Sequence, residues 1–262
     1  MVVEADLYAL MGSHIPDELR PDLQLTIREG LRLRHGSQGD KLIGYFGGLP
    51  ELPDGFDWPG DDRGHYDHVA TIDLARLPAL DLSLPASGRI TVFGDTRGWS
   101  GALLYFADDE VLQKTALPEV LERQNRLFRH VPMTYVTVPT IPSRQWLEEY
   151  LLRDDDHDDS VHERLESFAD IFFSHSSSWH QLGGWANEIQ GERDRGLRPD
   201  TTAERHFFPD YPPLGPVLIA KFDTDHELGI GWGDFGTLYC FIELERLEAR
   251  DFTNVEVHWE SY

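Results

Sequence analysis

Residues 217–242 read Val-Leu-Ile-Ala-Lys-Phe-Asp-Thr-Asp-His-Glu-Leu-Gly-Ile-Gly-Trp-Gly-Asp-Phe-Gly-Thr-Leu-Tyr-Cys-Phe-Ile, and this stretch decides the expected fold. Apolar residues recur through 217–223, 227–234 and 237–242, and turn-forming Gly and Asp residues lie between them. This pattern is typical of short strands joined by tight turns. We therefore predict an antiparallel β-meander, followed by a short helix at 243–249 and a last strand at 255–259.

The same kind of pattern occurs in the first half of the chain. Strand signals are found at 68–74, 88–95, 102–106 and 135–138, and the alternating leucines of 23–34 predict a strand pair around Glu29-Gly30. The Pro- and Gly-rich segment 47–60 predicts a loop. Helical spacing of apolar residues predicts helices at 3–11, 117–128, 143–152 and 160–173, the last two with Ser143 and Ser160 as N-caps. The acidic run 153–159 and the segment 183–215 predict solvated loops.

Two stretches share an order of features. The first stretch begins with Gly47-Gly48 and continues, in order, with Ile72-Asp73, Gly94-Asp95 and Leu104-Tyr-Phe106. The second begins with Gly183-Gly184 and continues with Phe222-Asp223, Gly233-Asp234 and Leu238-Tyr-Cys-Phe241. We interpret this echo as an internal duplication, against the alternative that short meanders resemble one another by chance. The predicted fold is a single α+β domain over 1–262, antiparallel and β-rich, with two pseudo-repeated β-meander lobes (40–140 and 175–262) and helices in the middle third. A groove between the lobes would be a natural binding site.

Composition excludes several classes of protein. The 262 residues include 47 acidic and 23 basic ones, for a net charge of −24, which disfavours nucleic acid and anionic membranes as ligands. The many aromatic residues argue against disorder, and no apolar run approaches the ~18 residues of a membrane span. A single cysteine, Cys240, and an N-terminus without signal-peptide features indicate a cytoplasmic protein.

Metal and cofactor motifs are weak. Asp223, Asp225 and Glu227 offer oxygen ligands at alternate positions, but an EF-hand loop needs glycine at its sixth position, where Leu228 stands. A water-facing acidic hairpin is the favoured interpretation of these three residues. The histidines show no His-Glu-x-x-His or His-x-His pattern, and no phosphate-binding or dinucleotide fingerprint occurs. We therefore expect no cofactor.

Catalytic motifs are also lacking. No Gly-x-Ser-x-Gly elbow occurs, and Cys240 lies between Tyr239 and Phe241 in an apolar strand, where a thiol is usually inert. Nothing selects one pair among the 47 acids for acid–base chemistry. We assign no catalytic residue and favour a protein that is not an enzyme.

A binding site is the remaining possibility for the polar and aromatic residues beside the glycine-rich turns. The candidate binding residues are His180, Gln181, Gln190, Trp58, Trp232 and Asp234. The imidazole and amide groups are of the kind that binds a small polar group or a backbone segment, and loop tryptophans can line a groove. The alternative is that the polar groups tie loops together and that the tryptophans cap the β-core.

An ordered set of motifs resembles a known family. The motifs are, in order, Gly47-Gly-Leu-Pro50 with Trp58-Pro59, Ala70-Thr-Ile-Asp-Leu74, His180-Gln-Leu-Gly-Gly184 with Ile189-Gln-Gly191, and Leu228–Phe241. Together they resemble the YwqG-like family over residues 40–253. That family often has a Ser-Lys pair before its Gly-Gly, where this chain has Gly44-Tyr-Phe46. The resemblance implies a bacterial domain of unknown function with a β-rich, pseudo-symmetric α+β fold. Some members of the family are similar in genetic setting to immunity proteins encoded beside polymorphic toxins.

Three functions follow as hypotheses. The leading one is a non-catalytic protein-binding module, an immunity protein whose acidic loops attract a basic toxin domain and whose aromatic residues anchor it. The second is a small-molecule or metal-dependent enzyme that uses the groove between the lobes, with His180, Gln190 and Asp234 as its polar lining. The third is a housekeeping scaffold. A deep pocket with convergent titratable groups would favour the second hypothesis.

Overall fold

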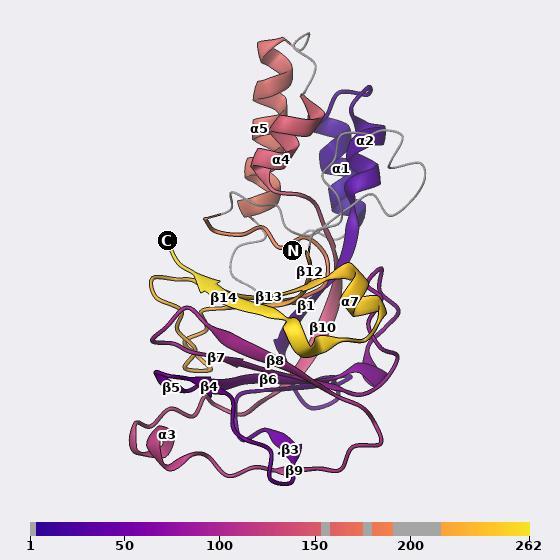
Figure 1. The fold of residues 1–262 in the computed structure, drawn as a ribbon. Coiled ribbons are helices and arrows are strands. Elements are labelled where there is room, and N and C mark those ends of the chain that lie inside the picture. The colour runs from indigo at the N-terminus through magenta and orange to yellow at the C-terminus, as the bar shows by residue number, and fades with distance from the viewer. Residues whose placement is uncertain (1–3, 153–157, 175–179, 191–215) are drawn as a thin grey trace.

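A curved antiparallel sheet forms most of the protein (Figure 1). The computed structural model describes residues 4–152, 158–174, 180–190 and 216–262. Among these residues, ten strands pair in the order β14-β13-β12-β11-β1-β10-β2-β6-β7-β8. They are β1 (Arg28–His35), β2 (Gly44–Phe46), β6 (Asp67–Asp73), β7 (Arg89–Gly94), β8 (Gly101–Phe106), β10 (Val131–Thr140), β11 (Gln181–Leu182), β12 (Pro216–Asp223), β13 (Thr237–Glu243) and β14 (Glu256–Glu260).

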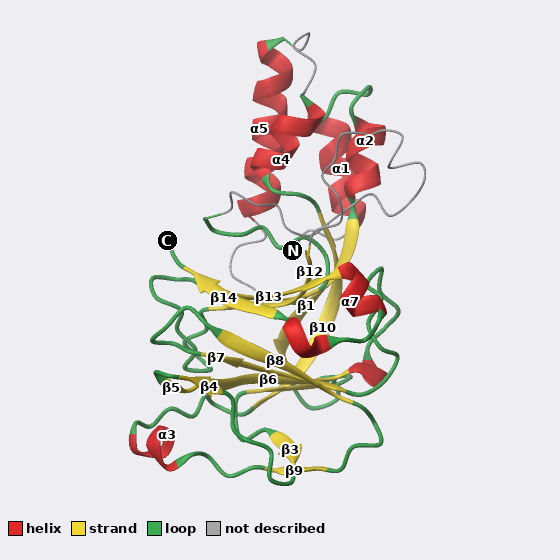
Figure 2. Cartoon of the chain, in the orientation of Figure 1, coloured by secondary structure: helices red, strands yellow, loops and turns green. Residues whose placement is uncertain are grey.

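The sheet is nearly closed. Ser100, just before β8, forms a bridge with His258 of β14, so the first and last strands of the order meet. Two small antiparallel pairs lie outside this sheet: β3 (Glu51–Pro53) pairs with β9 (Leu112–Lys114), and β4 (Gly60–Asp61) pairs with β5 (Gly64–His65). Figure 2 shows the curved sheet as two stacked layers of strands.

One face of the sheet holds the main core. Successive residues of a strand point to opposite faces, so the apolar members of each strand gather on the inside of the curve. Leu31 and Leu33 of β1, Phe222 of β12 and Trp259 of β14 belong to one buried cluster with residues from the other half of the sheet. A shared interior ties the two halves of the chain into one folding unit.

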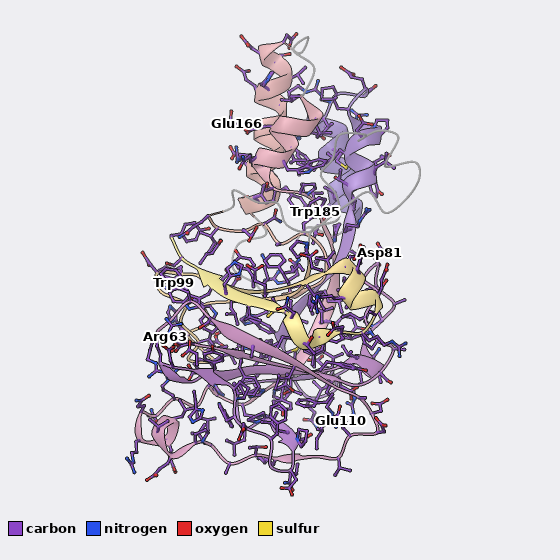
Figure 3. The ribbon with its side chains drawn as sticks, viewed as in Figure 1. Arg63, Asp81, Trp99, Glu110, Glu166 and Trp185 are labelled. Atoms are coloured by element: carbon purple, nitrogen blue, oxygen red, sulfur yellow. The ribbon has the colours of Figure 1, made fainter. Side chains whose placement is uncertain are left out.

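The helices form a second apolar cluster on the outer side of the β12–β14 layer (Figure 2). The four main helices are α1 (Glu4–His14), α2 (Arg20–Thr26), α4 (Arg144–Leu151) and α5 (Asp159–Ser174). Trp185 joins this cluster from the segment after β11, at the junction between helices and sheet (Figure 3). The N-terminal helices thus pack against those of the middle third. The shorter helices are η1 (Leu74–Arg76), α3 (Glu119–Arg123), α7 (Leu244–Glu248) and η2 (Phe252–Asn254).

The antiparallel, β-rich fold class is confirmed, and several local predictions are wrong. The helix predicted at 117–128 covers only Glu119–Arg123, and the loop predicted at 47–60 contains β3. The expected strand pair at 23–34 is helix α2 followed by β1, because Pro21 begins a helix whose Leu23 packs into the helical cluster. The expected strand at 227–234 is a turn, closed by a bridge between Asp225 and Ile230. Helix α5 is capped by Asp158, whose carboxylate accepts the N–H groups of Ser160 and Val161, and not by Ser160.

Ser143 does cap α4 by accepting the N–H of Trp146. The predicted loop at 183–215 is described only to residue 190, and 191–215 and most of the acidic run 153–159 lie outside the described residues. In the described part of the chain, no helix has the length and apolar character that a membrane crossing requires.

The internal repeat is not confirmed. Both Gly-Gly pairs follow a strand, β2 or β11, and all four glycines have positive φ. The residues aligned after them behave differently: Asp73 caps the short helix η1, whereas Asp223 leads into the 224–236 turn. The described parts of the 40–140 and 175–262 stretches contribute to one sheet and one core.

Candidate functional site

A row of polar side chains crosses the outer face of the sheet. Arg32, Gln181, Lys221, Tyr239 and His258 come from five neighbouring strands, and each lies directly opposite the next in the register. Directly opposed residues of antiparallel strands point to the same face. Their neighbours in each strand belong to the core on the other face. The sheet therefore places polar groups on the side that the helices and the segment after β11 cover.

The middle of this row lines a cavity of about 210 Å³. Gln181, Lys221 and Tyr239 contribute from the sheet, and Phe172 and Phe173 contribute from the end of α5. The other lining residues are Pro139, Thr140, Asn187, Ile189, Asp223, Phe235, Thr237 and Tyr262. Aromatic walls around a few polar groups are typical of small-molecule sites.

Lys221 is the main charged group in this cavity. Its side chain is 8% exposed, and its Nζ donates a hydrogen bond to the carbonyl oxygen of Ala186 at 3.1 Å. Burial lowers the pKa of the Lys221 ammonium group below its usual range, and the nearby charge of Asp223 opposes that shift. The chain has only two other lysines, Lys41 and Lys114, and both are exposed.

Other polar groups in the cavity have defined roles. Asp223 accepts a hydrogen bond from the Thr237 hydroxyl at 2.8 Å, and the Tyr239 oxygen accepts the N–H of Ile189 at 3.1 Å. Burial, and then the charges of nearby carboxylates, raises the pKa of the Tyr239 phenol above its ordinary value, so its O–H remains a donor. Oδ1 of Asn187 is buried and has no hydrogen-bond partner among the described residues.

A second group of titratable residues lies at the ends of β1 and β12. Oδ2 of Asp225 is 2.9 Å from Nε2 of His35 and 3.2 Å from Nε2 of His180. These residues line a more open depression of about 290 Å³ together with Arg32, Leu33, Arg34, Asp223 and Thr224. Burial disfavours the ionised form of Asp225, but hydrogen bonds from His180 and the Leu228 N–H, with the nearby histidines, hold the pKa of its carboxyl well below its usual range.

The arrangement of His180 does not fit a metal ligand. Its Nδ1 accepts a hydrogen bond from the backbone N–H of Asp223 at 3.1 Å, so the ring proton must lie on Nε2, where it points to Asp225. A metal-bound histidine instead donates its second ring N–H to a neighbour. The His35–Asp225–His180 cluster is therefore a hydrogen-bonded support for the 224–230 turn, in which Asp225 also accepts the N–H groups of Glu227 and Leu228.

A comparison with protein-family models bears on the identity of this fold. Residues 45–261 match the model of a domain of unknown function, DUF1963. The chain belongs to the DUF1963 family. The match agrees with the expectation of a domain of unknown function, although the YwqG-like name is not confirmed by it. No curated protein matches the sequence.

The DUF1963 domain does not gather the six sequence-predicted binding residues at one place. Gln181 lines the cavity and His180 lines the depression, and among the described residues only Asp223 lines both hollows. Nε2 of Gln181 donates to the carbonyl oxygens of Gly183 and Trp185, and Nε2 of Gln190 donates to that of Ser261. The interpretation that these amides tie loops together describes their contacts well.

The remaining predicted residues are distributed over the DUF1963 domain. Trp232 is fully buried in the main core, Trp58 packs edge-on against Phe93 in a separate small cluster, and Asp234 is exposed. The three weak metal candidates do not converge on one point. Asp223 lines both the cavity and the depression, Asp225 contacts His35 and His180, and the exposed Glu227 lies 3.3 Å from Nδ1 of His35.

Sequence reasoning missed Lys221, Tyr239, Asn187 and His258. The available signal for Lys221 was its place in the apolar run of β12, combined with the rarity of lysine in a chain whose basic residues are mostly arginine. A charged residue in a buried strand needs a reason, such as a partner or a ligand. No comparable signal marks Asn187, which takes its role from the turn after β11, where it has a φ of 50°.

Proposed function

We propose that this DUF1963 domain binds a small polar molecule in the outer-face cavity. The observation that carries the proposal is the placement of Lys221, a buried amine that opens onto an aromatic-walled space of about 210 Å³. Burying an amine costs free energy unless something compensates, and the hydrogen bond to Ala186 accounts for only one of its N–H groups in the described part of the chain. A ligand oxygen would supply the missing acceptor.

The cavity also indicates the chemistry of the ligand. Lys221 and the Tyr239 hydroxyl are donors, so they favour a carbonyl or carboxylate oxygen, and Oδ1 of Asn187 favours an N–H or O–H donor on the same molecule. Phe172, Phe173 and Tyr239 favour a flat apolar body between these ends. The volume lies below the ~300–1,000 Å³ of drug-sized sites, so the ligand is small.

A ligand screen with paired lysine variants tests this proposal. We would record saturation-transfer NMR spectra of the full chain with a panel of small aromatic and aliphatic carboxylates and amides, and repeat the hits with Lys221→Met and Lys114→Met. The expected result is binding that Lys221→Met weakens at least tenfold and that Lys114→Met, a change at an exposed lysine, leaves unchanged. Hits that bind both variants equally, or an empty panel, would count against the cavity.

The structure also offers a specific observation for the protein-binding hypothesis. Trp99, labelled in Figure 3, is 58% exposed. Its ring stacks on that of Trp259 of β14, with centroids 4.4 Å apart. An exposed tryptophan on a protein of net charge −24 is the kind of anchor that a basic partner uses. As a second proposal, the domain is a cytoplasmic immunity protein that neutralises a basic toxin domain through this surface.

A pull-down from the source cell at low and high salt tests this second proposal. One basic protein retained in stoichiometric amount, released as salt rises, and lost with Trp99→Ala would support it. Recovery of the same protein with Trp99→Ala would place the interface elsewhere, and empty beads at both salts would argue against a stable partner.

A further inference from the structure

Lys221 makes few contacts for a charged group that is shielded from solvent. It is 8% exposed, and in the described part of the chain its Nζ makes one hydrogen bond, to the carbonyl oxygen of Ala186, and no ion pair. An ammonium ion has three N–H donors to satisfy, whereas a neutral amine has two and loses much less hydration when it is buried. The surroundings of Lys221 therefore favour the neutral amine, and burial lowers the pKa of this group accordingly.

A neutral lysine amine is a nucleophile. Its nitrogen carries a lone pair that attacks a carbonyl carbon, and desolvated lysines in enzyme pockets form imines with carbonyl compounds for this reason. Lys221 lines a cavity of about 210 Å³, which has room for a small molecule. We propose that Lys221 forms an imine with a small aldehyde or ketone that binds in the outer-face cavity. This inference rests on the proposed function, because it adds a covalent step to binding in the same cavity.

The reaction balances without a further reactant. After the ammonium group has released one proton, the lone pair of Nζ forms a bond to the carbonyl carbon, and the electron pair of the C=O π-bond moves to the oxygen. The oxygen takes up the released proton and a second proton from the nitrogen. The C–O bond then breaks, water leaves, and the nitrogen lone pair forms the C=N bond. The product is a protonated imine with one N–H group, which can still donate to the carbonyl oxygen of Ala186.

Asp223 is suited to carry the proton between Nζ and the oxygen. It lies two residues after Lys221 in β12, and side chains two residues apart in a strand point to the same face. Both residues line the cavity. Oδ1 of Asp223 accepts a hydrogen bond from the Thr237 hydroxyl, and Oδ2 makes no hydrogen bond to the described residues. The carboxylate can therefore accept the proton that Nζ releases and return it to the departing oxygen, directly or through a water molecule.

Tyr239 offers a donor for the carbonyl oxygen of the ligand. It lies directly opposite Lys221 in the register of β12 and β13, and it lines the same cavity. Its hydroxyl oxygen accepts the N–H of Ile189, and the raised pKa of the phenol keeps the O–H group protonated and able to donate. A hydrogen bond from this O–H to the ligand would draw electron density from the carbonyl carbon and favour attack by Nζ.

The other two lysines of the chain provide an internal comparison. Lys41 lies 3.4 Å from the Tyr135 hydroxyl, Lys114 is in β9, and both are exposed. An exposed ammonium group is strongly hydrated, and in its charged form it has no lone pair with which to attack a carbonyl group. We therefore expect Lys221 to react with an aldehyde faster than Lys41 and Lys114, although it is the least exposed of the three.

Reductive trapping on the full chain tests the proposal. The protein would be incubated at pH 7 with 4-hydroxybenzaldehyde, which has a carbonyl group, a flat ring and a hydroxyl donor as the cavity favours. Sodium cyanoborohydride reduces an imine to a stable secondary amine, and peptide mass spectrometry locates the modified lysines. The expected result is an adduct at Lys221 that forms at least tenfold faster than those at Lys41 and Lys114. In guanidinium chloride, where the chain is unfolded, the three lysines should react at similar rates.

Two variants test the role of the phenol. Tyr239→Phe should slow trapping at Lys221 at least fivefold, and circular dichroism would show whether this variant is folded. Tyr135→Phe, which changes the tyrosine beside Lys41, is the matched control and should leave trapping at Lys221 unchanged. An unchanged rate in folded Tyr239→Phe would overturn the part assigned to its hydroxyl group.

A competing ligand separates this inference from the proposed function. A carboxylate that binds the wild type in the ligand screen should slow trapping at Lys221 and leave trapping at Lys41 unchanged. Trapping at Lys221 that is no faster than at Lys41 and Lys114 in the folded protein would overturn imine formation, and so would trapping that the carboxylate does not slow. If the carboxylate binds and Lys221→Met abolishes that binding, the proposed function stands even when no imine is trapped. If neither binding nor trapping is observed, both proposals are overturned.

Discussion

Two cations are largely shielded from solvent: Lys221 of β12, and Arg126, which lies between α3 and β10, and of these two, among the described residues, only Arg126 forms ion pairs with carboxylates. Arg126 is 11% exposed and forms ion pairs with Asp67 and Asp95, two carboxylates that are each 1% exposed. Lys221 donates to a backbone carbonyl and opens onto the cavity. A buried charge that is paired with opposite charges needs no ligand to explain it, whereas a buried charge beside a cavity does.

The largest expected effect concerns the paired cation. Arg126→Met would leave Asp67 and Asp95 buried without their main counter-charge, and removal of one partner from a buried pair typically costs about 3–5 kcal/mol. Urea unfolding followed by tryptophan fluorescence would measure the change. Arg123→Met breaks an exposed pair with Glu119 and should cost at most about 1 kcal/mol. If the two variants lost the same free energy of unfolding, the buried ion pairs of Arg126 would be no more stabilising than the exposed pair of Arg123.

The second prediction concerns His68, which lies beside Asp67 in the same half. Nδ1 of His68 faces the carbonyl oxygen of Gly48 and Nε2 faces the hydroxyl of Thr71, and burial lowers the pKa of His68 to about 4. A histidine with a depressed pKa stabilises the fold above its unfolded pKa of ~6.5, and this contribution is lost as the pH falls toward 4. The loss should amount to about 3 kcal/mol over that window.

Unfolding free energies at pH 7.5 and pH 4 check this prediction. Because carboxylates also titrate in this range, the quantity to compare is the difference between wild type and His68→Gln at each pH. That difference should shrink by about 3 kcal/mol at the lower pH. A constant difference would mean that His68 has the same pKa in the folded and unfolded states, and that this half of the sheet accommodates a charged imidazole.

Local sequence patterns predict the fold class of this chain and some, but not all, of its strands and turns. The β-rich, antiparallel class follows from local patterns such as 217–223 and 237–242, because strand signals and turns lie close together in the chain. The strand pair expected at 23–34 is wrong because alternating leucines fit a helix as well when another helix covers them. The turn at 227–234 has positive φ at Gly229 and Gly233, which interrupts a strand that its apolar residues alone would favour.

The candidate sites depend on pairing across long separations, and local patterns do not encode it. Lys221 meets Ala186 across 35 residues, and His258 meets Glu188 across 70. Register determines these contacts, because a shift of one residue would move Lys221 and Tyr239 to the core face. The motif around His180 and Gln181 points to both residues, but His180 precedes β11 and lines the depression, whereas Gln181 lies in β11 and lines the cavity.

The smallest expected effect concerns the cation that lacks a carboxylate contact. Lys221→Met keeps the length of the side chain and removes a charge that burial disfavours, so at pH 7 the free energy of unfolding should stay within about 1 kcal/mol of the wild type or rise. The pKa of Lys221 is lowered in the folded state, so the wild type gains stability as the pH rises toward the unfolded value of ~10.4, and the variant lacks this gain. Urea titrations at pH 7 and pH 9.5 should therefore show that the free energy of unfolding of the wild type, relative to that of Lys221→Met, is larger at pH 9.5 than at pH 7. Lys114→Met is the control.

A loss of several kcal/mol in Lys221→Met at pH 7 would mean that the hydrogen bond from Lys221 to Ala186 stabilises the fold, and the contrast with Arg126 would then disappear. A neutral or positive change would mean that the fold does not need this lysine, and a buried charge that folding does not need is best explained by a ligand.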